Sequence, residues 1–179
     1  GLLDQPELQA QSPLTLDLTK DGHMAVFSSP GYGKSTFLQT VVMDLAKQHN
    51  PAQLHVYLLD FGTNGLLPLT GLPHISDTIM IDEMVKIGKL IRILERILKE
   101  RKQKLSEYGV ANLGMYEKAS GLSVTTIVIV LDNYDAVREA DLVDEFERLI
   151  TKITRDGGRG GVDFITSTGR KEARRSPVM

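Results

Sequence analysis

The feature that most constrains the fold is a glycine-rich segment between a strand-like run and a helical pattern. The apolar run HMAVFS (residues 23–28) favours a buried strand, and the loop SPGYGKST (residues 29–36) follows it directly. From Lys34 onward apolar residues recur at helical spacing, namely Phe37, Leu38, Val41, Val42 and Leu45. The spacing predicts a helix that begins at Lys34 and ends before the HNP of residues 49–51. The loop is therefore expected at a helix N-terminus, where backbone N–H groups and the helix dipole favour an anion.

The rest of the chain alternates strand-like and helical patterns. Further strands are predicted at residues 14–18, 54–60, 125–132 and 162–167, and the third of these is apolar on both faces, as a central parallel strand should be. Helices are predicted at about residues 82–108, 111–119 and 141–154. Strands that alternate with helices indicate an α/β fold with a mainly parallel sheet flanked by helices.

The loop matches the phosphate-binding pattern G-x-x-x-x-G-K-[ST] except at its first position, where Ser28 replaces glycine. Such a loop wraps ATP phosphates with backbone N–H groups, its lysine reaches the β- and γ-phosphates, and its hydroxyl ligates Mg²⁺. Ser28 is small, so we expect distortion of the loop rather than loss of binding. The predicted ATP-binding residues are Ser29, Pro30, Gly31, Tyr32, Gly33, Lys34, Ser35 and Thr36.

A second acid is expected at the end of a neighbouring strand, where it would hold Mg²⁺ through water. Asp132 ends the run IVIVLD, so Ser35 and Asp132 are the predicted metal residues. Hydrolysing enzymes of this kind usually carry a carboxylate next, but here the residue is Asn133, whose amide cannot accept a proton from water. Loss of a positioned base costs about 10²–10⁴ in rate. Asp132 and Asn133 are thus a catalytic pair with a degenerate second position, for which Asp135 is a partial substitute.

Composition excludes several classes of protein. The chain of 179 residues fits one domain, with 41% hydrophobic and 25% charged residues. A net charge of −2 gives no general attraction to nucleic acid, and the absence of cysteine rules out disulfides and thiolate-bound metals. No apolar run approaches the ~20 residues of a membrane span. Both ends suggest a piece of a longer protein.

The ordered motifs SSPGYGKST, VYLLDFGTNGL, GLPH, ERILKERKQKLSEYGVANLGMYE and IVIVLDNYD resemble those of FtsK/SpoIIIE-type motor ATPases. The opening GLLDQPELQAQSPLTLDL is similar to the start of the later ATPase modules of type VII (ESX) secretion ATPases of the EssC/EccC family. The resemblance covers the whole chain. It implies a RecA/FtsK-like P-loop NTPase domain over residues 1–179, with residues 1–20 leading in from a preceding module. It also implies closing strands beyond RSPVM (residues 175–179) that this chain lacks.

The resemblance further implies a cytoplasmic module of a bacterial cell-membrane protein that binds ATP and Mg²⁺. Its partners would be neighbouring ATPase modules of the same polypeptide, in a ring-like assembly such as a hexamer, and small helical-hairpin substrates with a C-terminal signal. No nucleic acid is expected. Degenerate motifs favour the last module, acting in substrate recognition or regulation. In the family a glutamine at the end of the last strand senses the γ-phosphate, and Thr168 stands in its place here.

Two other functions remain open, an active DNA translocase and a nucleotide-free scaffold. Asn133 and Thr168 argue against the first, and Lys34, Ser35 and Asp132 argue against the second. The basic residues of the 82–108 helix, Arg101 among them, are interpreted as a solvated face with i,i+4 ion pairs. The apolar loop at residues 64–73 would pack either in the core or on a neighbouring module. Two interpretations stay open for Arg155, Arg159 and Arg170: arginine fingers that act on a neighbour's nucleotide, or plain surface or interface arginines, which are more common.

Overall fold

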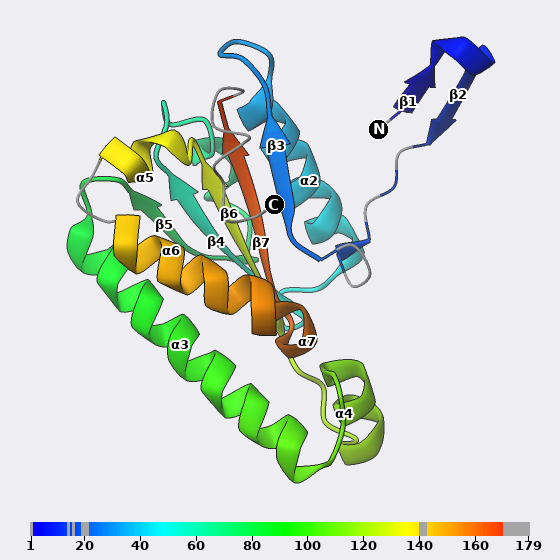
Figure 1. The fold of residues 1–179 in the computed structure, drawn as a ribbon, viewed down its shortest axis with the longest axis vertical. Helices are drawn as coiled ribbons and strands as arrows, with labels where there is room; N and C mark the ends of the chain where they lie inside the picture. The colour runs from blue at the N-terminus through cyan, green and yellow to red at the C-terminus, as the bar shows by residue number, and fades with distance from the viewer. Residues whose placement is uncertain (1, 14, 16, 19–21, 140–142, 170–179) are drawn as a thin grey trace.

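The structure, a computed structural model, describes residues 2–13, 15, 17–18, 22–139 and 143–169. Its centre is a five-stranded sheet in the order β3-β7-β6-β4-β5, and every neighbouring pair is parallel. The strands are β3 (Met24–Phe27), β4 (Leu54–Asp60), β5 (Ile75–Met80), β6 (Thr126–Asp132) and β7 (Val162–Thr168). Parallel pairing brings the carboxyl ends of all five strands to one edge, as Figure 1 shows. The predicted α/β fold with a mainly parallel sheet is confirmed.

Helices connect the strands and cover both faces of the sheet (Figure 1). They are α2 (Lys34–Gln48), α3 (Met84–Glu107), α4 (Leu113–Ser120), α5 (Asp135–Glu139), α6 (Val143–Lys152) and α7 (Gly158–Gly160). A π-helical turn, η3 (Ile153–Gly157), joins the last two, and a short 3₁₀ helix, η2 (Leu67–Leu69), lies between β4 and β5. In the described part of the chain, no helix is long and apolar enough to cross a membrane.

Strand β6 divides the core into two layers. Its residues Ile127, Ile129 and Leu131 pack on the side of α3 and α6, where Phe61 and Phe146 meet edge to face at 5.8 Å. Val128 and Val130 pack on the opposite side with residues of α2 and β4. Because successive side chains of a strand point to opposite faces, an apolar run such as IVIVL is buried only when both faces are covered.

An antiparallel hairpin precedes the sheet. It pairs β1 (Leu2–Gln5) with β2 (Ala10–Pro13) around the 3₁₀ helix η1 (Pro6–Leu8), and it stands apart from the central sheet in Figure 1. The predicted strand at 14–18 is wrong for Thr15 and Asp17, which have no regular structure, whereas residues 14 and 16 lie outside the described part.

Four further points of the sequence analysis are corrected or settled. Sequence analysis missed β5 and α5. Arg101 does not face solvent: it is only 8% exposed, because its guanidinium donates to the carbonyl oxygens of Thr125 (2.6 Å), Gly161 (2.9 Å) and Gly160.

Of the two alternatives for the loop at 64–73, core packing is confirmed for Leu66 and Leu69, which are 0% and 3% exposed. On the exposed side of α3, Arg96 and Glu100 form the expected i,i+4 pair at 3.8 Å.

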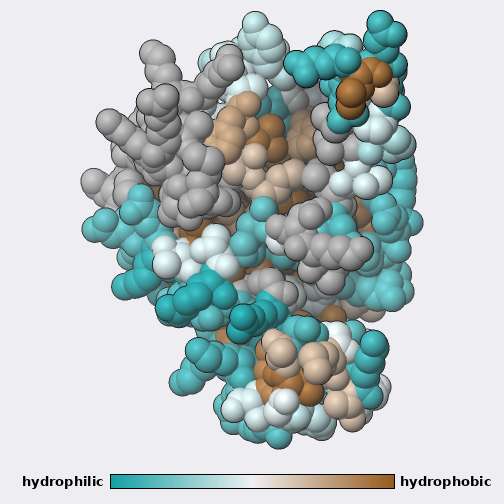
Figure 2. Space-filling view, turned by 45° about the vertical axis from the view of Figure 1, so that its right-hand side comes forward, coloured by the Kyte–Doolittle hydropathy of each residue, from teal (hydrophilic) through white to brown (hydrophobic). Residues whose placement is uncertain are grey.

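Exposed apolar side chains gather around α4. Tyr108, Met115 and Leu122 are 48%, 48% and 59% exposed. Figure 2 shows apolar atoms at the lower end of the molecule, where Figure 1 places α4.

Candidate nucleotide-binding site

The glycine-rich loop connects the end of β3 to the first residue of α2. Gly31 and Gly33 have φ values of 81° and 76°, in the left-handed region that only glycine adopts without strain. Gly33 is the N-cap of α2, so the first N–H groups of the helix point into the loop. The residues from Pro30 to Gly33 are exposed, and Tyr32 is 78% exposed. The loop therefore has the geometry of an anion cradle at a helix N-terminus.

The side chain of Lys34 contacts the start of this loop. Its Nζ donates hydrogen bonds to the carbonyl oxygens of Ser28 (3.0 Å) and Ser29 (3.2 Å). The ammonium group thus lies against the start of the loop, and no acidic side chain pairs with it among the described residues. Its charge is available to a phosphate that enters the cradle.

Ser35 and Asp132, 97 positions apart, meet beside the loop. The hydroxyl of Ser35 donates to Oδ2 of Asp132 at 2.6 Å. The other carboxylate oxygen, Oδ1, accepts a hydrogen bond from the hydroxyl of Ser167 at the end of β7. Asp132 is only 3% exposed, and two hydroxyl groups fix the orientation of its carboxylate. A hydroxyl and a carboxylate in contact at the mouth of a phosphate loop are oxygen ligands suited to Mg²⁺.

Asn133 follows Asp132 in a left-handed conformation, with φ at 66°. Its backbone N–H donates to Oγ of Ser167 at 2.9 Å, and its side-chain Nδ2 donates to the carbonyl oxygen of Phe61 at 3.1 Å. The side chain therefore ties the end of β6 to the loop after β4. Asparagine tolerates this backbone region better than most residues.

Asp135 and Thr168 contact each other at the same edge of the sheet. Oδ1 of Asp135 accepts from the hydroxyl of Thr168 at 2.8 Å, and Oδ2 accepts from the N–H of Gly169 at 2.7 Å. Thr168 is 1% exposed. Asp135 was expected to substitute in part for the carboxylate missing at position 133, but both of its oxygens are engaged with the end of β7.

The loop after β4 completes the site, and sequence analysis assigned it no role there. Asp60, which ends β4, accepts hydrogen bonds from the N–H groups of Gly62 (3.3 Å) and Leu66 (2.7 Å). Gln39 of α2 donates to the carbonyl oxygen of Gly65. A Cβ atom at Gly65 would lie 2.7 Å from Cβ and 2.9 Å from Oγ of Ser35, so only glycine fits there. The sequence does contain a signal for this role, because Asp60 ends a predicted strand and parallel strands would bring it to the same edge as Asp132.

Two of the three predicted arginine fingers lie away from the nucleotide loop of this chain. Arg155 belongs to η3 and Arg159 to α7, both of which precede β7 at the amino end of the sheet. Arg155 pairs with Asp156 at 3.1 Å. Both arginines lie at the opposite edge of the sheet from the nucleotide loop of this chain, and a role on a neighbour's nucleotide stays a prediction. Arg170 lies outside the described residues.

The strand–loop–helix, the loop lysine and the Ser35–Asp132 pair at the carboxyl edge of a parallel sheet define a P-loop nucleotide-binding fold. Residues 3–179 match the FtsK/SpoIIIE family, and the chain belongs to that family.

Its relatives are type VII secretion proteins. The chain is 44% identical over 179 residues to the type VII secretion system protein EssC of Staphylococcus aureus (strain MRSA252) and 39% identical to the ESX secretion system protein EccC of Geobacillus thermodenitrificans. All of the chain is matched, but it spans only 12% of each relative.

Solved structures agree with these relatives. ATPases 2 and 3 of EssC from Geobacillus thermodenitrificans match 99% of the chain with a TM-score of 0.91 at 39% identity, and the chain covers 34% of that structure. ATPases 2 and 3 of Thermomonospora curvata EccC, solved with a signal sequence peptide, match 99% of the chain with a TM-score of 0.86 at 28% identity, and the chain covers 33% of that structure.

Proposed function

We propose that this chain is an ATP–Mg²⁺-binding module of a membrane-bound type VII secretion protein of the EssC/EccC kind, facing the cytoplasm. The similarity to a 12% segment of EssC and EccC supports this placement. The likeness to structures of ATPases 2 and 3 supports a later module, and we infer the last.

One observation carries the nucleotide-binding part of the proposal. The Ser35 hydroxyl lies 2.6 Å from the Asp132 carboxylate, beside the Lys34 ammonium group and the N-terminus of α2. A scaffold domain gains nothing from a buried carboxylate held against a phosphate-type loop. These groups match the donor set that ATP–Mg²⁺ requires, namely backbone N–H groups, a cation and two oxygen ligands.

Each residue would act as follows when ATP binds. N–H groups of residues 31–36 would hold the β-phosphate, with Thr36 near the α-phosphate, and Lys34 would exchange the carbonyls of Ser28 and Ser29 for phosphate oxygens. Ser35 would ligate Mg²⁺ directly and Asp132 would hold it through water, since Ser167 keeps that carboxylate in place. Bound Mg²⁺ neutralises phosphate charge.

We infer that hydrolysis is slow. Asn133 offers no proton acceptor, and its amide is engaged with Phe61. Asp135 is engaged with Thr168 and Gly169, and Thr168 remains only a proposed γ-phosphate sensor. A module that binds ATP but turns it over slowly would serve substrate recognition or the regulation of a more active neighbour. Its partners would be adjoining ATPase modules, in a ring such as a hexamer, and small helical-hairpin substrates. The signal peptide bound by Thermomonospora curvata EccC supports a substrate with a signal sequence.

The test measures ATP affinity by calorimetry and steady-state turnover for the chain and for Lys34→Ala. We expect Mg²⁺-dependent ATP binding that weakens at least about tenfold in Lys34→Ala, with turnover below about 1 s⁻¹, the low end for enzymes. Rapid DNA-stimulated turnover would instead identify a DNA translocase. ATP affinity that is absent, or unchanged in Lys34→Ala, would identify a scaffold.

A further inference from the structure

A groove with a basic lining lies between α3 and the end of α6, two helices that run side by side in Figure 1. We call it the basic groove, and its volume is about 590 Å³. Its lining holds two carboxylates and six cations, the latter being Arg92, Arg96, Lys99, Lys102, Lys152 and Arg155. The groove therefore has a net charge of +4 in a chain whose total charge is −2.

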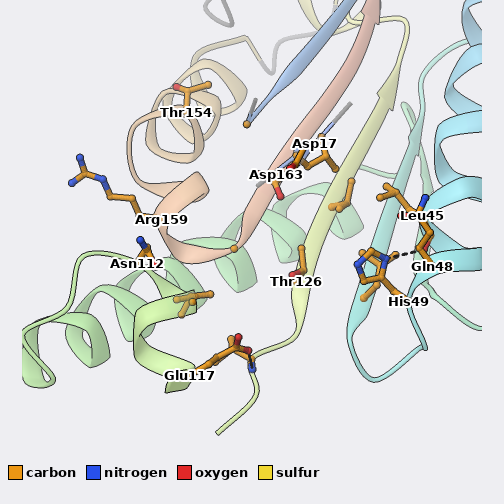
Figure 3. A pocket seen from close by; sticks show the side chains of 18 of the residues that line it. Asp17, Leu45, Gln48, His49, Asn112, Glu117, Thr126, Thr154, Arg159 and Asp163 are labelled. Atoms are coloured by element: carbon orange, nitrogen blue, oxygen red, sulfur yellow. Dashed lines mark hydrogen bonds between the residues drawn. The ribbon is translucent and has the colours of Figure 1, made fainter. Parts of the chain in front are cut away.

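A larger cavity, at the amino end of the sheet, lacks this prevailing charge. Its volume is about 970 Å³, and Figure 3 shows Asp163, Glu117 and Arg159 among its lining residues, with Arg159 extending away from Asp163. Part of its wall is the segment around Asp17 and Gly22, in which residues 19–21 lie outside the described part of the chain. The basic groove, by contrast, is lined entirely by described residues, so the charge of its lining is defined.

The two carboxylates of the basic groove are already paired with cations. Nζ of Lys152 lies 2.8 Å from Oε1 of Glu95, which connects α6 to α3, and Nη2 of Arg155 lies 3.1 Å from Oδ2 of Asp156. The hydrogen bond from Arg155 lowers the pKa of Asp156, and the nearby charge of Lys102 lowers it further. The groove thus accommodates carboxylate groups against its cations at ion-pair distance.

The remaining cations of the groove have weaker partners or none. Arg92, Lys99 and Lys102 are exposed on α3 and form no ion pair within the described part of the chain. Arg96 contacts Glu100 at 3.8 Å, but both side chains are more than half exposed. Exposed pairs of this kind contribute little free energy, so the charge of Arg96 also remains available to a ligand.

The cations of α3 recur at helical spacing. Arg92, Arg96, Lys99 and Lys102 lie on one side of the helix, because residues three or four positions apart are neighbours on a helix surface. At 1.5 Å per residue they form a row of about 15 Å. A single metal-sized or phosphate-sized ion is too small to contact such a row, whereas a chain with carboxylates at the same spacing would pair with several of the cations at once.

We propose that the basic groove binds an acidic protein segment, whose aspartate or glutamate side chains pair with Arg92, Lys99 and Lys102. A protein segment is favoured over nucleic acid because Glu95 and Asp156 lie in the lining, where they would repel an unbroken row of phosphates. A protein segment with neutral residues between its acids avoids that repulsion. The groove contains no residue of the nucleotide loop, so the proposal does not rest on ATP binding.

The experiment follows binding of the peptide Ac-Glu-Ala-Ala-Ala-Glu-Ala-Ala-Glu-Ala-Ala-Glu-NH₂ to the isotope-labelled chain by NMR, in about 0.15 M salt. Its glutamates have the spacing of the α3 cations, and the matched peptide carries glutamine in their place. We expect the glutamate peptide to shift the amide signals of Lys99 and Lys102 and to bind at least about tenfold more tightly than the glutamine peptide, a difference of about 1.4 kcal/mol. The double variant Lys99→Gln, Lys102→Gln should bind it at least about fivefold more weakly. The double variant Lys104→Gln, Lys118→Gln, which removes the same charge outside the groove, should change its affinity less than about twofold.

Equal affinity for the two peptides, or an equal loss in the two double variants, would overturn the proposal. So would tighter binding of a short DNA duplex or of phosphatidylglycerol vesicles through the same two lysines, because the groove would then serve a phosphate surface. Amide signals away from α3 that match those of the wild-type chain show that each variant is folded. ATP affinity, measured in parallel, should be the same in both double variants as in the wild-type chain, which separates this result from the nucleotide test.

Discussion

Replacing Asp163 by asparagine should remove a specific pH dependence from the stability of the chain. In the folded protein burial raises the pKa of Asp163 from 3.8 to about 6. The folded state therefore holds this proton more tightly than the unfolded chain. As the pH rises from below 3.8 to above 6, the wild-type chain should lose about 3 kcal/mol of unfolding free energy through this group alone, and above that range the loss stays constant. Water in the cavity makes this value an upper bound.

Urea unfolding of the wild-type chain and Asp163→Asn, followed by circular dichroism between pH 4.5 and pH 7.5, measures this effect. Because other titrating groups cancel in the difference, the stability of the variant relative to wild type should rise by up to about 2 kcal/mol between pH 4.5 and pH 7.5. The difference between Asp156→Asn and wild type should stay nearly constant over this range, since the hydrogen bond from Arg155 lowers the pKa of Asp156 and its titration therefore lies at lower pH. A wild-type–variant difference for Asp163 that does not change with pH would refute the reasoning, because the carboxylate would then be solvated or paired.

Three further substitutions test the nucleotide site and the packing. Gly65→Ala should weaken Mg²⁺-dependent ATP binding about tenfold or more in calorimetry, because the new Cβ would lie 2.7 Å from that of Ser35; Gly71→Ala, with nothing within 4 Å, should have no effect. Asn133→Glu should not raise turnover, because glutamate in the left-handed region costs about 1–2 kcal/mol and the bond to Phe61 is lost. A tenfold gain would show that the missing carboxylate alone limits the rate. Arg101→Ala should lower the unfolding free energy by about 2–4 kcal/mol, whereas Arg96→Ala, at an exposed ion pair, should change it by less than about 1 kcal/mol.

Local patterns in the sequence predict most of the helices and strands and part of the nucleotide-binding site. The loop with Lys34 and Ser35, and the acid at Asp132, follow from residue type and spacing within single elements, so the sequence predicts them. The register between strands does not follow from spacing. It places Ser167 beside Asp132 and Asn133, and it explains why their hydrogen-bond network was not foreseen.

Strand β5 and the burial of Arg101 were also not predicted, because both depend on contacts with distant parts of the chain. Strand β5 has the sequence ISDTIM, in which polar residues interrupt the apolar ones, and only Ile79 is fully buried. Arg101 has the spacing of a solvent-facing residue on α3, yet it is buried because carbonyl groups from the turn before β7 and the segment before β6 meet it there. Both outcomes depend on segments distant in the chain.

Strand β7 runs from the amino edge of the sheet to the nucleotide site. It begins beside the cavity with Asp163 and ends with Ser167 and Thr168 at the nucleotide site, about 17 Å away at 3.3 Å per residue. Every residue of the strand is buried, so it has no slack with which to absorb a displacement. A load applied to Asp163 along the strand axis would therefore reach the hydroxyl of Ser167 and, through it, the carboxylate of Asp132.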